Sequence, residues 1–135
     1  MISKIFVNLP VQDLERSMAF FRKVGFDFNP NFTDHTAACM VIGEAIHAML
    51  LTHEKFGEFT SKSIADARSS TEVLTALACD SREEVDRMVD RALEAGGSPA
   101  REPKDHGFMY ERAFEDPDGH IWEIFWMDES AIPAQ

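Results

Sequence analysis

Two residues of this 135-residue chain, His47 and Glu123, combine reactive side chains with matching positions. Each lies four residues after a turn glycine, Gly43 for His47 and Gly119 for Glu123, inside an apolar run that predicts a strand. Imidazole and carboxylate groups both bind divalent metals. As a hydrogen-bonded pair they also transfer protons, because the carboxylate holds one imidazole tautomer and raises its basicity. An acid–base pair and an inert hydrogen-bonded pair are therefore the hypotheses that these two side chains raise together.

The elements that position His47 follow a β-α-β-β-β order in the first half of the chain. Residues 5–11 alternate as a strand does, and Asp13 stands at the N-cap of a helix that Gly25 ends. Three further strands are predicted at residues 26–28, 37–42 and 46–51. We assign residues 1–52 to this first module.

A polar segment separates the two halves of the chain. Residues 53–71 are rich in Lys, Ser, Thr and Asp and show little periodicity, which predicts a connecting loop with one helical turn at residues 64–68. A strand is predicted at residues 72–79. The second module then spans residues 72–127, and residues 128–135 form a tail.

The second module repeats the element order of the first. Ser81 and Glu84 have the spacing of a capping box, which predicts a helix start, and Gly96 and Gly97 end that helix. The remaining strands are predicted at residues 100–101, 110–115 and 120–126. A sheet with one helix leaves its other face bare, and two such modules solve this problem by pairing. We therefore expect one α+β domain built from two βαβββ modules.

Composition excludes several classes of function. The formal net charge of -11 and the lack of a Lys and Arg cluster argue against nucleic-acid binding. No apolar run approaches the roughly 18 to 20 residues that span a membrane. Cys39 and Cys79 lack a CxxC spacing, so we expect reduced thiols and a cytoplasmic location.

Two stretches of the sequence resemble a known family. Residues 116–123, D-P-D-G-H-I-W-E, and residues 11–21, V-Q-D-L-E-R-S-M-A-F-F, are similar to the glyoxalase, bleomycin-resistance and extradiol-dioxygenase superfamily, also called vicinal oxygen chelate proteins. The resemblance covers nearly the whole chain. It implies curled mixed sheets around a cleft that receives a small molecule, with the helices on the outside. Family members often pair, so we expect a homodimer.

The resemblance also implies a metal site that is incomplete in this chain. Family enzymes place one ligand on the first and one on the last strand of each half. The last-strand positions correspond to His47 and Glu123, which can bind metal. The first-strand positions, counted as seven residues before Asp13 and before Asp80, are Phe6 and Val73, which have no lone pair to donate. We expect at most weak binding of Zn, Ni or Fe, because catalytic sites generally use three protein ligands.

Strand alternation predicts which side chains line the cleft with His47 and Glu123. The predicted lining residues are Phe6, Asn8, Met49, Thr75 and Phe125, with Val73 at a vacated ligand place and Tyr110 after a loop at the cleft mouth. A lining of this kind suits an apolar ligand with a few polar contacts, although these side chains also suit a filled core.

The function predicted from the sequence is small-molecule binding of unassigned activity. One alternative is a metal-dependent lyase or dioxygenase similar to lactoylglutathione lyase. Another is a metal-free enzyme in which Glu123 or His47 acts as acid or base. No cofactor is predicted beyond a divalent metal.

Overall fold

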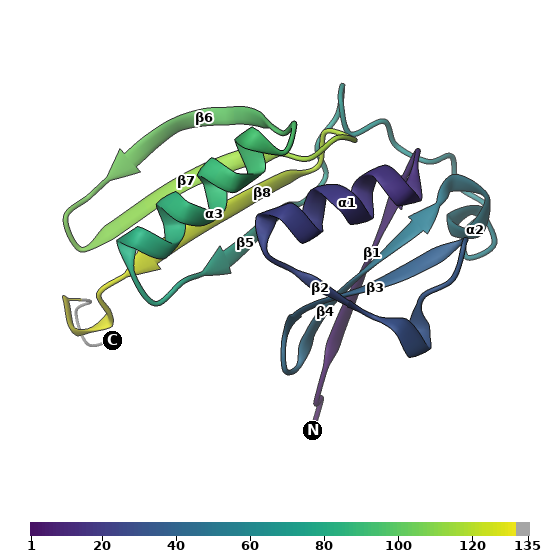
Figure 1. Cartoon of the computed structure of the whole chain (residues 1–135), viewed down its shortest axis with the longest axis horizontal. Coiled ribbons are helices and arrows are strands. Elements are labelled where there is room, and N and C mark those ends of the chain that lie inside the picture. The colour runs from purple at the N-terminus through teal and green to yellow at the C-terminus, as the bar shows by residue number, and fades with distance from the viewer. Residues whose placement is uncertain (132–135) are drawn as a thin grey trace. The chain divides into compact units, whose positions relative to one another are not determined.

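A computed structural model describes residues 1–131 of the chain (Figure 1). The chain divides into two compact units, Met1–Asp66 and Ala67–Gln135. Each unit contains a four-stranded mixed sheet and one long helix, so the predicted α+β fold with two βαβββ modules is confirmed. Of the predicted tail, residues 129–131 form a short 3-10 helix, and residues 132–135 lie outside the described residues.

The first unit builds its sheet in the order β1-β4-β3-β2, with β1 parallel to β4 and the other pairs antiparallel. Helix α1 begins where Asp13 predicted, because the Asp13 carboxylate accepts a hydrogen bond from the Arg16 amide at 3.1 Å. It ends at Gly25, whose φ of 126° suits only glycine well. The elements are β1 (Ile5–Val11), α1 (Leu14–Val24), β2 (Asp27–Asn29), a 3-10 turn (Pro30–Phe32), β3 (Ala37–Gly43) and β4 (Ile46–Thr52).

Helix α1 covers one face of this sheet (Figure 1). Alternate residues of the strands, including Leu9, Met40 and Leu50, are buried on the α1 side. His47 and Met49 alternate with Ala48 and Leu50 on β4, so their side chains point to the face away from α1.

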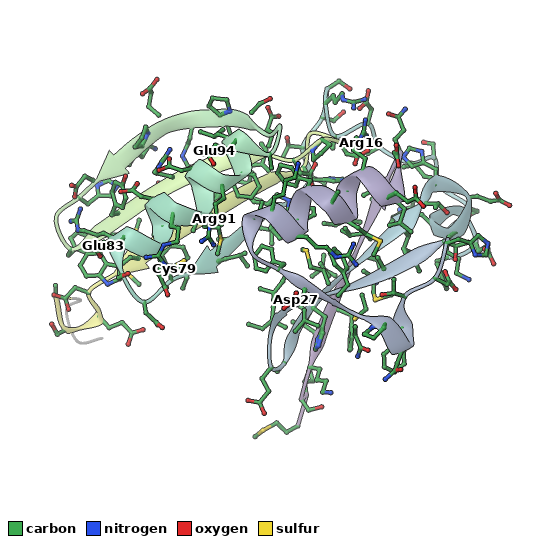
Figure 2. The ribbon with its side chains drawn as sticks, in the orientation of Figure 1. Arg16, Asp27, Cys79, Glu83, Arg91 and Glu94 are labelled. Atoms are coloured by element: carbon green, nitrogen blue, oxygen red, sulfur yellow. The ribbon has the colours of Figure 1, made fainter. Side chains whose placement is uncertain are left out.

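The second unit repeats this arrangement in the order β5-β8-β7-β6, with β5 parallel to β8. The Ser81 hydroxyl accepts from the Glu84 amide at 3.2 Å, and the Glu84 carboxylate accepts from the Asp80 amide at 3.0 Å, one residue before the cap. The exposed side of α3 carries charged residues such as Glu83 and Arg91 (Figure 2). The elements are β5 (Leu74–Ala78), α3 (Arg82–Glu94), β6 (Ser98–Asp105), β7 (Met109–Glu115) and β8 (Ile121–Met127).

The connecting segment differs from the prediction. Helix α2 (His53–Gly57) follows β4 directly, because the Thr52 hydroxyl accepts from the Lys55 amide at 3.1 Å and caps it. The helical turn predicted at residues 64–68 is wrong, since no helix forms there. No helix among residues 1–131 is long and apolar enough to cross a membrane.

Strand β6 is longer than the predicted residues 100–101 and is irregular. Its pairing with β7 shifts register on both sides of Arg101. Pro99 and Pro103 flank this residue and have no amide hydrogen to give to the ladder. Prolines are tolerated here because β6 is an edge strand, and the resulting bulges hide its alternation from a sequence pattern.

The turn between β7 and β8 sets the register of the strand that carries Glu123. The buried Asp116 carboxylate accepts hydrogen bonds from the amides of Asp118 and His120 and from the Trp122 indole, at 2.9, 3.1 and 3.0 Å. Gly119 has a φ of 92°, and a Cβ there would lie 2.9 Å from the backbone of residues 67–68. Glycine is therefore required by both conformation and space.

We predict that Asp116→Asn lowers the free energy of unfolding by about 1–3 kcal/mol, because an amide at this position leaves one buried group without a suitable partner. The Asn oxygen can accept hydrogen bonds as one carboxylate oxygen does. The Asn NH₂ group is a donor, and it would face either the Trp122 indole N–H or the two backbone N–H groups, which are donors too. Urea denaturation followed by fluorescence measures the change. The control is Asp27→Asn at an exposed position, which we expect to change stability by less than about 0.5 kcal/mol. An unchanged stability for D116N would contradict the role of Asp116.

Candidate functional site

The two candidate residues lie on equivalent strands of different units. His47 is on β4 of the first unit and Glu123 is on β8 of the second. Their meeting across a cleft stays a prediction.

His47 shares one face of the first sheet with three of the predicted lining residues. The β1–β4 register places Phe6 opposite His47 and Asn8 opposite Met49. The Phe6 and His47 rings are stacked, with centroids 4.5 Å apart and an interplanar angle of 15°. Phe6 stands where the family resemblance implies a metal ligand, and it covers the imidazole with a hydrocarbon ring.

The imidazole of His47 is buried and incompletely hydrogen-bonded. Its residue is only 9% exposed, and Nδ1 is buried without a hydrogen-bond partner among the described residues. A buried polar nitrogen in this state costs stability, and natural sites that tolerate the cost call for a functional explanation.

A cavity of about 470 Å³ lies in the first unit, partly on the same sheet face. Asn8 and Leu51 contribute from β1 and β4, and Leu51 alternates in phase with His47 and Met49. The other walls come from Phe56 on α2 and from residues 59–60 after it. This cavity has apolar walls with one amide and one hydroxyl, which is the usual composition of a small-molecule pocket.

The second sheet places the predicted residues differently. The β5–β8 register puts Ala76 opposite Glu123 and Thr75 opposite Trp122. Trp122 is fully buried and lies on the other face of β8 from Glu123. The prediction that Thr75 shares the face of Glu123 is therefore wrong, and Val73 lies before β5 instead of on it.

The cause of this error is the position of the helix cap. Asp13 caps α1, but Ser81, not Asp80, caps α3. Counting seven residues back from Ser81 gives Leu74, which alternates onto the face of Glu123 and is 52% exposed. Leu74 also has no lone pair, so the vacated ligand place remains apolar after the correction.

Tyr110 lies on the wrong face for the predicted ligand contact. It pairs with Trp126, and its hydroxyl donates to the Asp86 carboxylate on α3 at 2.6 Å. The preceding turn is bound to α3 as well, because Arg82 donates to both Asp105 oxygens at 2.9 Å. These bonds lower the pKa of the Asp105 carboxyl to about 2. Phe125, in contrast, alternates onto the face of Glu123, as predicted.

Glu123 is bound by an arginine that the sequence did not indicate. Arg101 on β6 donates through Nη1 to Glu123 Oε2, and through Nη2 to Glu111 Oε1 at 2.8 Å. The side chains of Arg101, Glu111 and Glu123 are 28%, 17% and 21% exposed. The hydrogen bond to Glu123 raises the pKa of the Arg101 guanidinium. Two carboxylates and one guanidinium leave this triad with one net negative charge.

The donor atoms of each unit do not fit the divalent metal that the family resemblance implies. In the first unit, Phe6 stacks on His47 where a second ligand is needed. In the second, the guanidinium of Arg101 binds both Glu111 and Glu123. Within residues 1–131, no group of three or more His, Cys, Asp or Glu side chains is arranged to hold a metal ion.

The two cysteines have no reactive setting. Both are free thiols, and burial raises the pKa of Cys39 and of Cys79. A raised pKa keeps a thiol protonated and unreactive at neutral pH.

We predict that His47→Leu leaves stability unchanged or raises it by about 1 kcal/mol, because the substitution removes a buried nitrogen without a partner and keeps an apolar contact with Phe6. Urea denaturation gives the free energy of unfolding. The matched control is Met49→Leu, two residues along the same strand face, for which we expect a change of less than about 1.5 kcal/mol. A loss of more than about 2 kcal/mol in H47L would show that Nδ1 has a partner.

Comparison with known proteins agrees with this architecture. The model of the Glyoxalase/Bleomycin resistance protein/Dioxygenase superfamily matches residues 5–124. A hypothetical protein from S. aureus is 32% identical, with 93% of this chain and 95% of that chain covered and a TM-score of 0.78. No curated protein matches the chain.

Two more distant structures share the fold. A fosfomycin resistance protein from Mesorhizobium loti is 18% identical over 96% of this chain and 97% of its own, with a TM-score of 0.69. Lactoylglutathione lyase from Agrobacterium tumefaciens is 16% identical over 95% and 96%, with a TM-score of 0.66. The fold, the turn at residues 116–119 and the family match together show that this chain belongs to the Glyoxalase/Bleomycin resistance protein/Dioxygenase superfamily.

Proposed function

We propose that this chain binds a small organic molecule without a catalytic metal. The observation that carries the proposal is the binding of Glu123 by Arg101, which also binds Glu111. A carboxylate in a charge-assisted hydrogen bond has already exchanged water for a cation, so a metal at this oxygen must displace the guanidinium. The metal-dependent lyase and dioxygenase alternatives are therefore disfavoured, because Glu123, the metal ligand that they need on β8, is bound by Arg101.

The ligand surface that we propose in the first unit is the sheet face away from α1. Phe6 is 48% exposed and offers an aromatic ring, and Asn8 offers an exposed amide. The cavity beside Asn8 has the phenyl groups of Phe56 and Phe59 in its walls. A neutral, largely apolar ligand with one or two hydrogen-bonding groups matches these contacts.

A second candidate function is metal-free acid–base catalysis by His47. The observation that favours it is the unpartnered Nδ1, since a general base needs a nitrogen that no other group occupies. The Arg101 ion pair disfavours Glu123 as the base, because the guanidinium occupies the carboxylate oxygen that would have to accept the substrate proton. The free thiols Cys39 and Cys79 accord with the cytoplasmic location that we propose.

The proposal predicts that protein dialysed against EDTA keeps its melting temperature within about 1 °C and still binds the neutral apolar dye Nile red. A metal that binds weakly stabilises the native state little, so its removal changes little. Elemental analysis should find substoichiometric Zn, Ni and Fe. Metal bound at one equivalent would contradict the proposal.

Two matched variants test whether Nile red binds in the cavity. Phe59→Ser removes a wall of the cavity and should weaken Nile red binding, whereas Phe32→Ser should not. Both phenylalanines are mostly exposed, at 70% and 66%, so the two variants remove similar apolar surface. Equal losses in both variants would show that the dye does not report on this cavity.

The homodimer remains part of the proposed function. Strands β1 and β5 lie at sheet edges and expose Ile5 and Leu74 at about half of their surface. An exposed apolar edge strand is a template for pairing with another chain. Analytical ultracentrifugation at micromolar concentration should give about twice the chain mass of 15.2 kDa. A single species at the chain mass would contradict the dimer.

A further inference from the structure

We propose that Arg101 is a built-in cation of the second unit, and that its removal converts Glu111 and Glu123 into a site for a divalent cation. The inference rests on the proposed function in one respect, namely that the wild-type protein is free of metal. It goes further because it assigns the cause to one side chain and predicts a binding activity that the wild-type protein lacks.

The two carboxylates are placed on one face of the sheet by β7 and β8. Glu111 pairs with Phe125, and Glu123 pairs with Ala113, so the two glutamates are diagonal neighbours. Diagonal pairs lie about 7–8 Å apart at the backbone, which lets long side chains converge on a shared cation. Both carboxylates are about four-fifths buried, so leaving them together without a cation is costly.

Arg101 reaches these carboxylates through the irregular part of β6. Between two register shifts it pairs with Ala113 of β7, which lies on the same sheet face as Glu111 and Glu123. Its Nε is buried without a hydrogen-bond partner among the described residues, although both terminal nitrogens are bound. The guanidinium therefore donates hydrogen bonds to both glutamates, while its own Nε–H stays unbonded within the described part of the chain.

Loss of the guanidinium leaves two negative charges close together in a partly buried place. Two responses are available at neutral pH: one carboxyl takes up a proton, or the pair binds a cation. Carboxylate oxygens suit hard cations such as Mn²⁺, Mg²⁺ and Ca²⁺. Water completes the coordination of such an ion, so two glutamates are sufficient for a weak site.

The chain contains a matched arginine on the other face of the same sheet. Arg112 on β7 binds Asp86 and Asp90 of α3, each at 2.9 Å. These aspartates are 48% and 59% exposed, so water solvates them when the arginine is removed. Arg112→Met therefore removes an arginine that binds two carboxylates, but the two carboxylates that remain are exposed to water.

The test measures Mn²⁺ binding to the full chain at pH 7, from the loss of the free-ion electron paramagnetic resonance signal. The proteins are wild type, R101M, R101Q, R112M and the double variant R101M/E111Q. We expect R101M and R101Q to bind one Mn²⁺ with a Kd on the order of 1 mM or tighter, and wild type to show no binding at these concentrations. We expect R101M/E111Q and R112M to match wild type.

Each other result overturns the inference. Equal Mn²⁺ binding by wild type and R101M means that Arg101 excludes no cation, and equal gains in R101M and R112M mean that any acidic pair suffices. No gain in folded R101M or R101Q, checked by circular dichroism, means that the pair is not a cation site. These failures leave the proposed function standing, whereas tight metal in the wild-type protein, or no dye binding by it, defeats the proposed function itself.

Discussion

The hydrogen bonds from Arg101 to Glu111 and Glu123 determine the charge and the metal affinity of the second sheet on its face away from α3. They join β6, β7 and β8, which carry the three side chains. Two carboxylates this deeply buried require a cation, and here the chain supplies its own. Arg101 reaches that face because it pairs with Ala113 of β7, which pairs in turn with Glu123. The internal cation is thus supplied by the edge strand of the sheet.

In the first unit, the residue at the equivalent position has no charged partner among the residues that the structure describes. Its last-strand residue, His47, is stacked against Phe6, and its buried Nδ1 has no hydrogen-bond partner in the described part of the chain. One unit therefore holds a carboxylate in an ion pair, and the other an imidazole with one nitrogen that has no hydrogen-bond partner among residues 1–131. Because an unpaired buried nitrogen lowers stability, a nitrogen in this state accords better with ligand binding than with a purely structural role.

Membership of the superfamily explains the fold and the strand register, but it does not determine the role of the residue at position 123. The turn at residues 116–119 brings the last strand into a set register, because Asp116 binds three N–H groups and Gly119 lies against residues 67–68. Any side chain four residues after that glycine takes the place of Glu123. What the position does then depends on its neighbours, which is why one fold serves many activities.

The order of the elements could be predicted from the sequence because local interactions determine it. Asp13, the Ser81–Glu84 pair and the turn at Asp116 each act within a few residues, and the structure forms all of them. The face of Thr75 could not be predicted, because it depends on which of two adjacent polar residues caps α3. The partner of Glu123 lies 22 residues away on a bulged strand, where alternation no longer shows which way a side chain points. Only tertiary packing decided that pairing, and with it whether the Glu123 carboxylate is a metal ligand or half of an ion pair.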